Sequence, residues 1–166
     1  VTQVVEYQYD VFNRRIARTV TDGAEEVVLA ERYVWDGRDL VLVLDGDGDV
    51  QHRIVTGPVI DQVLADEDVS GETVDWFLAD HEGSVRDVVS SAGTVAAHVV
   101  YSAFGAVTDH TGDLPRFAFA GRELDSETAL YYNRLRYYDA GTGRFLSEDP
   151  IGFGGGDDNL YRYVRN

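Results

Sequence analysis

The chain has 166 residues, of which 44% are apolar and 11% aromatic, enough for one folded domain with a core and unlike a disordered segment. Its 30 acidic residues against 14 basic ones give a formal charge of −16, and every basic residue is an arginine standing among acids, which argues against a nucleic-acid-binding surface. The absence of cysteine excludes disulfides and thiol chemistry, and no apolar run is long enough for a membrane-spanning helix. The sequence begins at Val1 and lacks methionine, so we expect an internal piece of a longer protein.

Short runs of apolar residues broken by turn residues dominate the chain. Residues 27–30, 40–44 and 95–101 are typical, because β-branched and aromatic side chains fit a pleated, half-buried surface. Turn pairs such as Asp22-Gly23 and Asp36-Gly37 recur about every ten residues, which leaves no room for the crossover helices of a parallel sheet. The pattern predicts an all-β fold, an antiparallel β-hairpin meander with less than about a tenth of its residues in helix.

Only the segment from Leu124 to Leu135 is compatible with a helix. Asp125-Ser126-Glu127 precedes an apolar run, as at the start of a helical turn, whereas the tyrosine pair at Tyr131-Tyr132 favours a strand. Both interpretations stay open from the sequence.

A short aromatic motif recurs along the chain: an aromatic residue, a spacer, a second aromatic residue and a polar turn. Tyr7-Gln8-Tyr9-Asp10 is echoed at Tyr33-Val34-Trp35-Asp36, at residues 101–105 and at Tyr137-Tyr138-Asp139. Tyrosine-rich strands are common in β proteins, but a repeated unit that cannot cover its own apolar face stacks on its neighbours. We therefore predict that the repeat aromatics pack on sheet faces, and these are Tyr9, Trp35, Trp76, Tyr101, Phe104, Tyr132, Tyr138 and Tyr161.

The second half of the chain resembles the RHS or YD-repeat proteins. Residues 78–85 (Leu-Ala-Asp-His-Glu-Gly-Ser-Val) are similar to the family's Asp-His-x-Gly-Ser segment, and residues 100–105 to its Tyr-x-x-Phe-Gly segment. The strongest similarity covers residues 119–139 and continues through Gly143-Arg144-Phe145-Leu146-Ser147-Glu148-Asp149-Pro150-Ile151-Gly152, as in the RHS-associated core. Ala129 and Ala140 depart from the family's usual glycine and proline.

The resemblance implies a β strip that spirals into a hollow shell, closed by the core segment. We expect residues 1–75 to form a YD-repeat strip and residues 76–166 an RHS-associated core that ends before the family's second Asp-Pro-x-Gly-Leu motif. The implied partners are the remainder of the same polypeptide and its C-terminal domain, with further copies of the chain as an alternative through strand edges. The implied location is secreted or at the bacterial cell surface, and no cofactor is implied.

In toxin members of the family the core is an aspartic protease with two aspartates. Asp149, in Asp149-Pro150-Ile151-Gly152, matches the first motif, and the second motif is absent from the sequence. Because one carboxylate must hold a proton while the other activates water, we predict no proteolysis by this chain alone. Asp149 also fits an ordinary Asp-Pro turn. Asp139 is the runner-up acid, and Arg144 is a candidate for orienting Asp149 or for pairing with Glu148.

No other catalytic or metal site is supported by the sequence. Asp45, Asp47 and Asp49 mimic a calcium loop, but the acid expected at its end is replaced by Thr56. The four histidines have no metal-ligand spacing, and His81 is expected to be a structural turn residue bonded to backbone. Three functions remain: a structural shell and closure module, part of an aspartic autoprotease, and a self-assembling or adhesive β polymer built through open strand edges.

Overall fold

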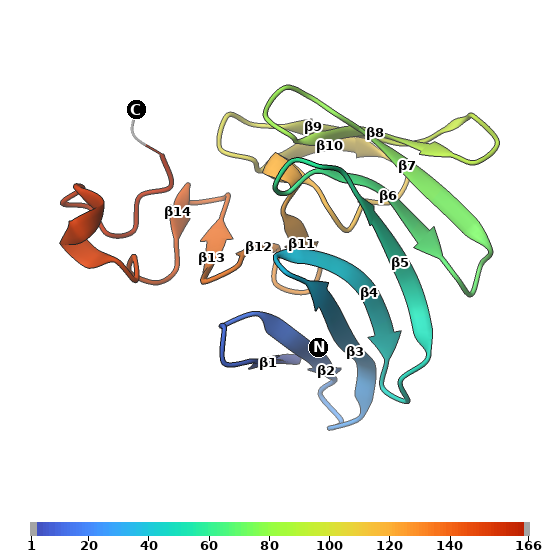
Figure 1. The fold of residues 1–166 in the computed structure, drawn as a ribbon, viewed down its shortest axis with the longest axis horizontal. Coiled ribbons are helices and arrows are strands. Elements are labelled where there is room, and N and C mark those ends of the chain that lie inside the picture. Colours follow the sequence, from blue (N-terminus) through green and yellow to red (C-terminus); the bar gives the residue numbers. More distant parts are fainter. Residues whose placement is uncertain (1–2, 165–166) are drawn as a thin grey trace.

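The computed structural model describes residues 3–164, which form two antiparallel sheets (Figure 1). The large sheet has ten strands in chain order, so each strand pairs only with its sequence neighbours. Its strands are β1 (Val4–Tyr9), β2 (Arg15–Thr21), β3 (Val27–Asp36), β4 (Asp39–Asp45), β5 (Val50–Thr56), β6 (Val63–Asp68), β7 (Thr73–Ala79), β8 (Val85–Ser90), β9 (Val95–Tyr101) and β10 (Val107–Thr111).

The small sheet has four short strands, also in chain order. They are β11 (Glu123–Asp125), β12 (Leu130–Asn133), β13 (Arg136–Asp139) and β14 (Arg144–Phe145), and two 3-10 turns, η1 (Phe119–Gly121) and η2 (Gly152–Gly155), flank them. Figure 1 shows that the large sheet curves around β11 and β12, while β14 and η2 lie beyond its rim.

The curvature of the large sheet follows from its irregular ladders. Eight of the nine strand pairings contain a register shift, and only the β6–β7 pairing is regular over its described length. A bulge bends its strand and increases the local twist. Repeated bulges therefore turn what would be a flat meander into a trough with a concave face.

The core lies on that concave face and is divided into two clusters. In one, Tyr33, Leu40, Val43, Ile54, Phe77, Val85, Val88 and Ala97 of the large sheet surround Phe117. In the other, Phe119, Tyr131, Tyr138 and Phe145 pack with Ala118 and Ala140. Each large apolar side chain buried in this way contributes on the order of 2 kcal/mol.

The all-β prediction is confirmed, with 51% strand and 4% helix. The ambiguous segment Leu124–Leu135 forms parts of β11 and β12 and no helix. The reason is local: the Asp125 side chain accepts hydrogen bonds from the backbone N–H groups of Glu127 and Thr128, and Ala129 has a φ of +56°. This closes a turn in which a helix cannot continue.

The predicted burial of the repeat aromatics is met to different degrees. Tyr132 and Tyr138 are buried, and Trp35, Tyr101 and Tyr161 are half-buried. Tyr9, Trp76 and Phe104 are exposed, although none of the three has more than half of its surface in solvent. Trp76 shows the cause, because strand alternation turns its neighbour Phe77 into the core and leaves Trp76 on the convex face.

Candidate functional site

Two parts of the chain meet on the concave face. We call residues 4–111 the strip and residues 112–164 the C-terminal segment. The expected boundary between residues 75 and 76 falls within β7, and the large sheet continues across it to Thr111. Contact between the strip and the C-terminal segment concentrates along one edge of the strip, which we call the docked edge: the row of turns that follow β1, β3, β5, β7 and β9.

Hydrogen bonds connect the C-terminal segment to turns of the docked edge. The Tyr131 hydroxyl donates to the Gly105 carbonyl at 2.9 Å, and the Tyr138 hydroxyl donates to the Phe104 carbonyl at 2.7 Å. The backbone N–H of Ala120, in η1, donates to the hydroxyl of Ser84 in the β7–β8 turn at 3.0 Å. Ser84 thus accepts a backbone hydrogen bond at this contact.

The β5–β6 loop adds an ion-pair contact to the docked edge. Asp61 binds Arg122 at 2.6 Å and Arg134 at 2.5 Å. Asp61 has a φ of +64°, and its carbonyl oxygen lies only 2.4 Å from where a Cβ on Gly121 would stand. Glycine is therefore required at position 121 for the two segments to approach this closely.

A buried ion cluster joins the strip to the C-terminal segment, and we call it the clasp. It consists of Arg15 and Arg18 of β2, Glu31 of β3, and Arg116, Glu123, Asp125 and Glu127 of the C-terminal segment. The cluster holds three guanidinium groups against four carboxylates, so the opposite charges nearly balance. Arg15, at 1% exposure, is among the most buried side chains of the described residues.

Glu123 and Arg116 form the centre of the clasp. Arg15 Nη2 lies 2.5 Å from Glu123 Oε2, and Arg116 Nη1 lies 3.0 Å from Glu123 Oε1. The other nitrogen of Arg116, Nη2, lies 2.6 Å from Glu31 Oε1. Glu123 therefore reaches the strip directly through Arg15, and Arg116 reaches it through Glu31.

Arg18 forms the other side of the clasp. Its guanidinium lies 3.4 Å from Glu31 and 3.5 Å from Asp125, and it contacts Glu127. The Tyr7 hydroxyl donates to Asp125 at 2.6 Å. Arg18 Nε and Arg15 Nε have no hydrogen-bond acceptor among the described residues, so burying the cluster carries a desolvation cost. The ion pairs must offset this cost, and only the docked arrangement brings the opposite charges together.

Two groups at the clasp, Glu31 and Tyr7, have shifted pKa values. Burial would raise the pKa of Glu31, but Arg116 above all, with Tyr33 and Arg18, lowers it to about 2. Burial, followed by the hydrogen bond to Asp125, raises the pKa of Tyr7 to about 12. At neutral pH Glu31 is ionised and Tyr7 is a neutral donor, which is the arrangement that the ion pairs need.

Aromatic rings enclose the Arg15 guanidinium. Its carbon lies 4.6 Å from the ring centres of Tyr33 and Tyr132 and 5.6 Å from that of Tyr7. The Tyr132 hydroxyl accepts a hydrogen bond from the Arg15 backbone N–H at 2.9 Å, and the Trp35 indole donates to the Arg15 carbonyl at 2.8 Å. The repeat tyrosines thus hold a cation as well as filling space.

Asp149 lies outside the clasp, in a turn near the end of the described chain. Its Oδ1 accepts the Ile151 backbone N–H at 3.1 Å, as in an Asp-Pro turn, and its Oδ2 lies 3.1 Å from Arg136 Nη2. The Arg136 guanidinium also stands 3.6 Å from the centre of the Phe145 ring. Arg136, which the sequence analysis did not single out, is therefore the described ion-pair partner of Asp149.

The other two candidate residues are separate from Asp149. Asp139 caps a turn, where its carboxylate accepts hydrogen bonds from the backbone of Gly141 and from the Thr142 hydroxyl, each at 2.8 Å. Arg144 is exposed and lies over the ring of Tyr161 at 5.3 Å. Within residues 3–164, no ion pair joins Arg144 to Asp149 or to Glu148.

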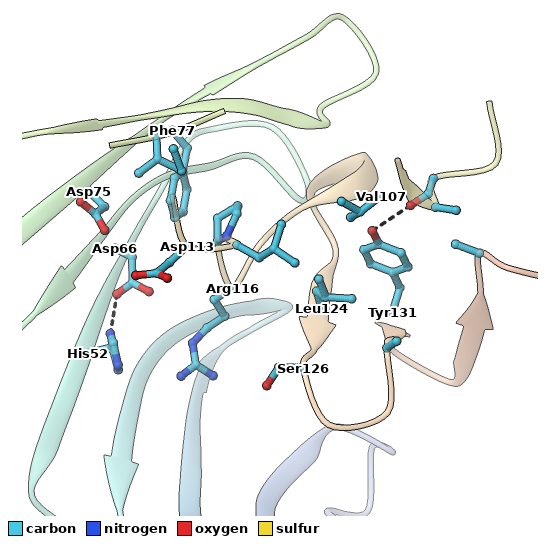
Figure 2. A pocket seen from close by; sticks show the side chains of 18 of the residues that line it. His52, Asp66, Asp75, Phe77, Val107, Asp113, Arg116, Leu124, Ser126 and Tyr131 are labelled. Carbon is cyan, nitrogen blue, oxygen red and sulfur yellow. Dashed lines mark hydrogen bonds and ion pairs between the residues drawn. The ribbon is translucent and has the colours of Figure 1, made fainter. Parts of the chain in front are cut away.

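A cavity of about 770 Å³ lies between the two sheets (Figure 2). Asp66, Asp75 and Asp113 gather at one end, and the His52 ring contacts Asp66 at 2.9 Å, whereas Val107, Leu124 and Tyr131 lie at the other end. Burial, together with the carboxylates of Asp66 and Asp68, raises the pKa of Asp75. Arg18 and Arg116 line the same cavity, so its acidic end faces cations as well as apolar side chains.

The described residues contain no group of three or more histidines and acids placed to hold a metal ion. The Asp45 carboxylate accepts backbone N–H groups of its own hairpin turn, from Asp47, Gly48 and Asp49. His81, predicted to be bonded to backbone, is instead 89% exposed at the side chain and stands 4.0 Å from Glu82. Its turn is closed by Asp80, which accepts the N–H groups of Glu82 and Ser84. No helix among these residues is long and apolar enough to cross a membrane.

The curved meander and its docked C-terminal segment define the chain as a piece of a YD-repeat shell. A family model described as teneurin YD-shell matches residues 70–159, more than half of the chain. The chain belongs to this family.

Named relatives agree with this assignment. "Double-stranded DNA deaminase toxin A" of Burkholderia cenocepacia is 34% identical, with 96% of this chain and 13% of the relative covered. "Probable deoxyribonuclease RhsA" of Dickeya dadantii is 32% identical, with 96% of this chain and 11% of the relative covered. The crystal structure of TcdB2-TccC3 without its hypervariable C-terminal region has the same fold, with a TM-score of 0.72 and 22% identity over 98% of this chain and 8% of that one. The chain thus spans only about a tenth of these proteins.

Proposed function

We propose that the chain is a closure module in the wall of a hollow RHS shell, which encloses the C-terminal domain of a longer polypeptide. The observation that carries the proposal is the clasp: seven charged groups, five of them buried, fix the C-terminal segment against the concave face of the strip. A wall that turns inward and is held there narrows the enclosed space. The same proposal keeps residues 1–75 as YD-repeat sequence and residues 76–166 as RHS-associated core sequence, both within one continuous wall.

The relatives indicate what such a shell encloses. Those named above are a toxin and a probable deoxyribonuclease, and each is many times longer than this chain. We infer that the longer protein carries a toxic C-terminal domain, that its main partner is that domain, and that it is secreted or displayed at a bacterial surface. No role in nucleic-acid binding is assigned to the wall, because its excess charge is negative.

Protease protection of the longer protein tests enclosure. We expect the C-terminal domain to resist a protease in the native protein and to be digested once the shell is unfolded. Arg116→Met removes a clasp cation that bridges Glu31 and Glu123 and should increase digestion of the domain. The matched control is Arg53→Met, which breaks an exposed cross-strand pair with Glu67 and should leave protection unchanged. Equal digestion of the C-terminal domain in the native and unfolded protein would refute enclosure.

A second function, release of the C-terminal domain by aspartic proteolysis, is favoured by the position of Asp149. Its carboxylate is held by Arg136 and by the Ile151 N–H, a fixed geometry of the kind that a catalytic acid needs. The second carboxylate must come from sequence outside this chain. In the longer protein, Asp149→Asn should keep the fold and abolish cleavage, while Asp139→Asn should cleave normally. Cleavage lost only in Asp139→Asn would move the assignment to Asp139, and normal cleavage in both variants would leave enclosure alone.

A further inference from the structure

The strip and the C-terminal segment also meet through a pair of tyrosines. Tyr9 ends β1 and Tyr137 lies in β13, 128 residues further along the chain. The Tyr9 hydroxyl donates a hydrogen bond to the Tyr137 hydroxyl at 3.1 Å. No other tyrosine pair among residues 3–164 has its two hydroxyls in contact. The contact lies outside the clasp, and the Tyr9 side chain is 43% exposed.

A contact between two hydroxyls is a geometry in which phenols can couple oxidatively. One-electron oxidation of a tyrosine removes an electron and the phenolic proton, and the radical that remains is reactive at the ring carbons next to the hydroxyl-bearing carbon. Hydroxyls 3.1 Å apart therefore bring the reactive ends of the Tyr9 and Tyr137 rings together. The exposure of Tyr9 gives an oxidant access to the pair.

Further aromatic rings surround Tyr137 and connect the pair to the interior. The centre of the Tyr137 ring lies 5.1 Å from that of Tyr7 and 5.6 Å from that of Tyr132. The Tyr132 ring in turn lies 6.3 Å from that of Trp35. Electrons pass between aromatic side chains at such separations, so an oxidised ring of this group is reduced by its neighbour. A radical formed on any of these rings can therefore reach the pair.

The composition of the chain makes its aromatic rings the preferred sites of oxidation. Cysteine and methionine, whose sulfur atoms are readily oxidised, are absent from the 166 residues, whereas ten tyrosines and two tryptophans are present. Within this chain an oxidant therefore meets no sulfur atom that would react in place of a tyrosine.

A second tyrosine pair has closer rings but a different placement. The rings of Tyr138 and Tyr163 stack with their centres 4.1 Å apart. Tyr138, however, is only 1% exposed, and its hydroxyl donates to the Phe104 carbonyl. Its reactive end thus faces backbone, and both rings belong to the C-terminal segment. Coupling of this pair would not join the segment to the strip.

We propose that Tyr9 and Tyr137 form an oxidative coupling site, at which a haem peroxidase and hydrogen peroxide join β1 to β13 through a carbon–carbon bond. Each phenol gives up one hydrogen atom, and the two radicals join at the carbons beside the hydroxyl-bearing carbons. Both rings then regain their aromatic form and keep their hydroxyls. Hydrogen peroxide takes up the two electrons and the two protons and becomes two water molecules. The bond fixes the C-terminal segment to the strip across 128 residues, whether or not the wall encloses a domain.

Treatment of the longer protein with a haem peroxidase and a limiting amount of hydrogen peroxide tests the site. Trypsin cuts this chain only after arginine, so Tyr9 lies in the peptide that ends at Arg14 and Tyr137 lies in the peptide of residues 137–144. From the native protein we expect these two peptides joined, lighter by two hydrogen atoms and with the fluorescence of dityrosine. Tyr9→Phe should abolish this product. Tyr7→Phe, in the same peptide, is the matched control and should leave the product nearly unchanged, because the Tyr7 hydroxyl binds Asp125.

The joined chain should also resist urea better. A covalent bond between distant residues restricts the unfolded chain, so the urea midpoint of the oxidised protein should lie above that of Tyr9→Phe treated in the same way. An unchanged midpoint would refute the role of the bond in fixing the segment.

Other products would overturn the site itself. An equal yield of the joined peptides from urea-unfolded protein would show that the native contact does not direct the coupling. Coupling of Tyr138 to Tyr163 in place of Tyr9 to Tyr137 would show that ring stacking decides the reaction. A doubled mass on a denaturing gel would show that the reaction joins separate molecules.

Discussion

Replacing Arg15 by methionine removes a clasp cation and keeps much of its apolar length. In the parent chain the Arg15 guanidinium lies 2.5 Å from Glu123 and 3.9 Å from Asp125, and the variant removes this cation from both buried carboxylates. Breaking a buried ion pair in this way costs about 3–5 kcal/mol. Losing the three ring contacts adds about 0.5–2 kcal/mol each, partly offset by methionine packing against the same rings. Arg116 still pairs Glu123 and Arg18 still lies near Asp125, so the ion-pair loss falls at the lower end of its range. We expect the free energy of unfolding to fall by about 4 kcal/mol, a large share of the roughly 5–15 kcal/mol of an ordinary domain.

Urea unfolding followed by tryptophan fluorescence measures this change, since the Trp35 indole donates to the Arg15 carbonyl. Arg53→Met, at an exposed pair, should cost less than about 1 kcal/mol. Arg15→Met combined with Glu123→Leu should recover part of the loss, because the carboxylate oxygen that faced Arg15 is then gone while Arg116 keeps its ion pair with Glu31. If Arg15→Met and Arg53→Met destabilised the chain equally, the clasp would not hold the two segments together.

Three further outcomes follow from the same contacts. The pKa of Glu31 is lowered from 4.5 to about 2 in the folded chain, so its ionised form contributes about 3 kcal/mol to the free energy of unfolding. This contribution is present above pH 4.5 and is lost as the pH falls toward 2. Glu31→Gln should therefore flatten that part of an acid unfolding curve. Tyr7, with its pKa raised from 10.0 to about 12, stabilises the fold below pH 10 and loses this effect as the pH rises through 12, so alkaline unfolding, followed by tryptophan fluorescence, should begin at a higher pH in the parent chain than in Tyr7→Phe. Gly121→Ala places a Cβ 2.4 Å from the Asp61 carbonyl oxygen. Gly93 has a similar φ, but a Cβ there would meet nothing within 4 Å. In the same urea assay, Gly121→Ala should therefore lower the free energy of unfolding by at least about 2 kcal/mol more than Gly93→Ala.

Each of these three has a clear contrary result. An acid unfolding curve that is the same for Glu31→Gln and the parent chain would show that Arg116 does not hold that carboxylate ionised. Alkaline unfolding at the same pH in Tyr7→Phe and the parent chain would show that the Tyr7 hydroxyl does not stabilise the fold. Equal losses for the two glycine variants would mean that the β5–β6 loop moves away from Gly121 at little cost.

The strip could be predicted from the sequence because its signals are local. Alternating runs such as residues 40–44 specify strands, and the Asp-Gly turns between them specify hairpins, so the all-β meander needed no long-range information. The ambiguity at Leu124–Leu135 had a local cause as well. An acid-rich start followed by an apolar run suits a helix, and only the positive φ of Ala129, which a sequence does not display, decides for a turn.

The clasp could not be predicted, because its members look ordinary one at a time. Arg15 and Arg18 resemble solvent-facing residues of a strand, and the alternating acids Glu123, Asp125 and Glu127 resemble a polar turn. Two arginines in β2, and acids spaced by two in and just after β11, were the available signal. Such a pattern gains meaning only once the two strands are known to face each other. The same holds for Arg136, whose partner Asp149 lies beyond another hairpin.

The chain order of the large sheet has a consequence for how the protein acquires its structure. Every strip hairpin closes between neighbours in the sequence, whereas the clasp joins Arg15 to Glu123, 108 residues apart, and Tyr7 to Asp125, 118 residues apart. Local contacts form early and distant ones late, because closing a long loop costs chain entropy. Strands can therefore assemble one after another as the polypeptide leaves the ribosome, with the clasp formed last. Contacts made after the rate-limiting step act on unfolding, so clasp substitutions should speed the opening of the wall and leave the rate of its assembly nearly unchanged.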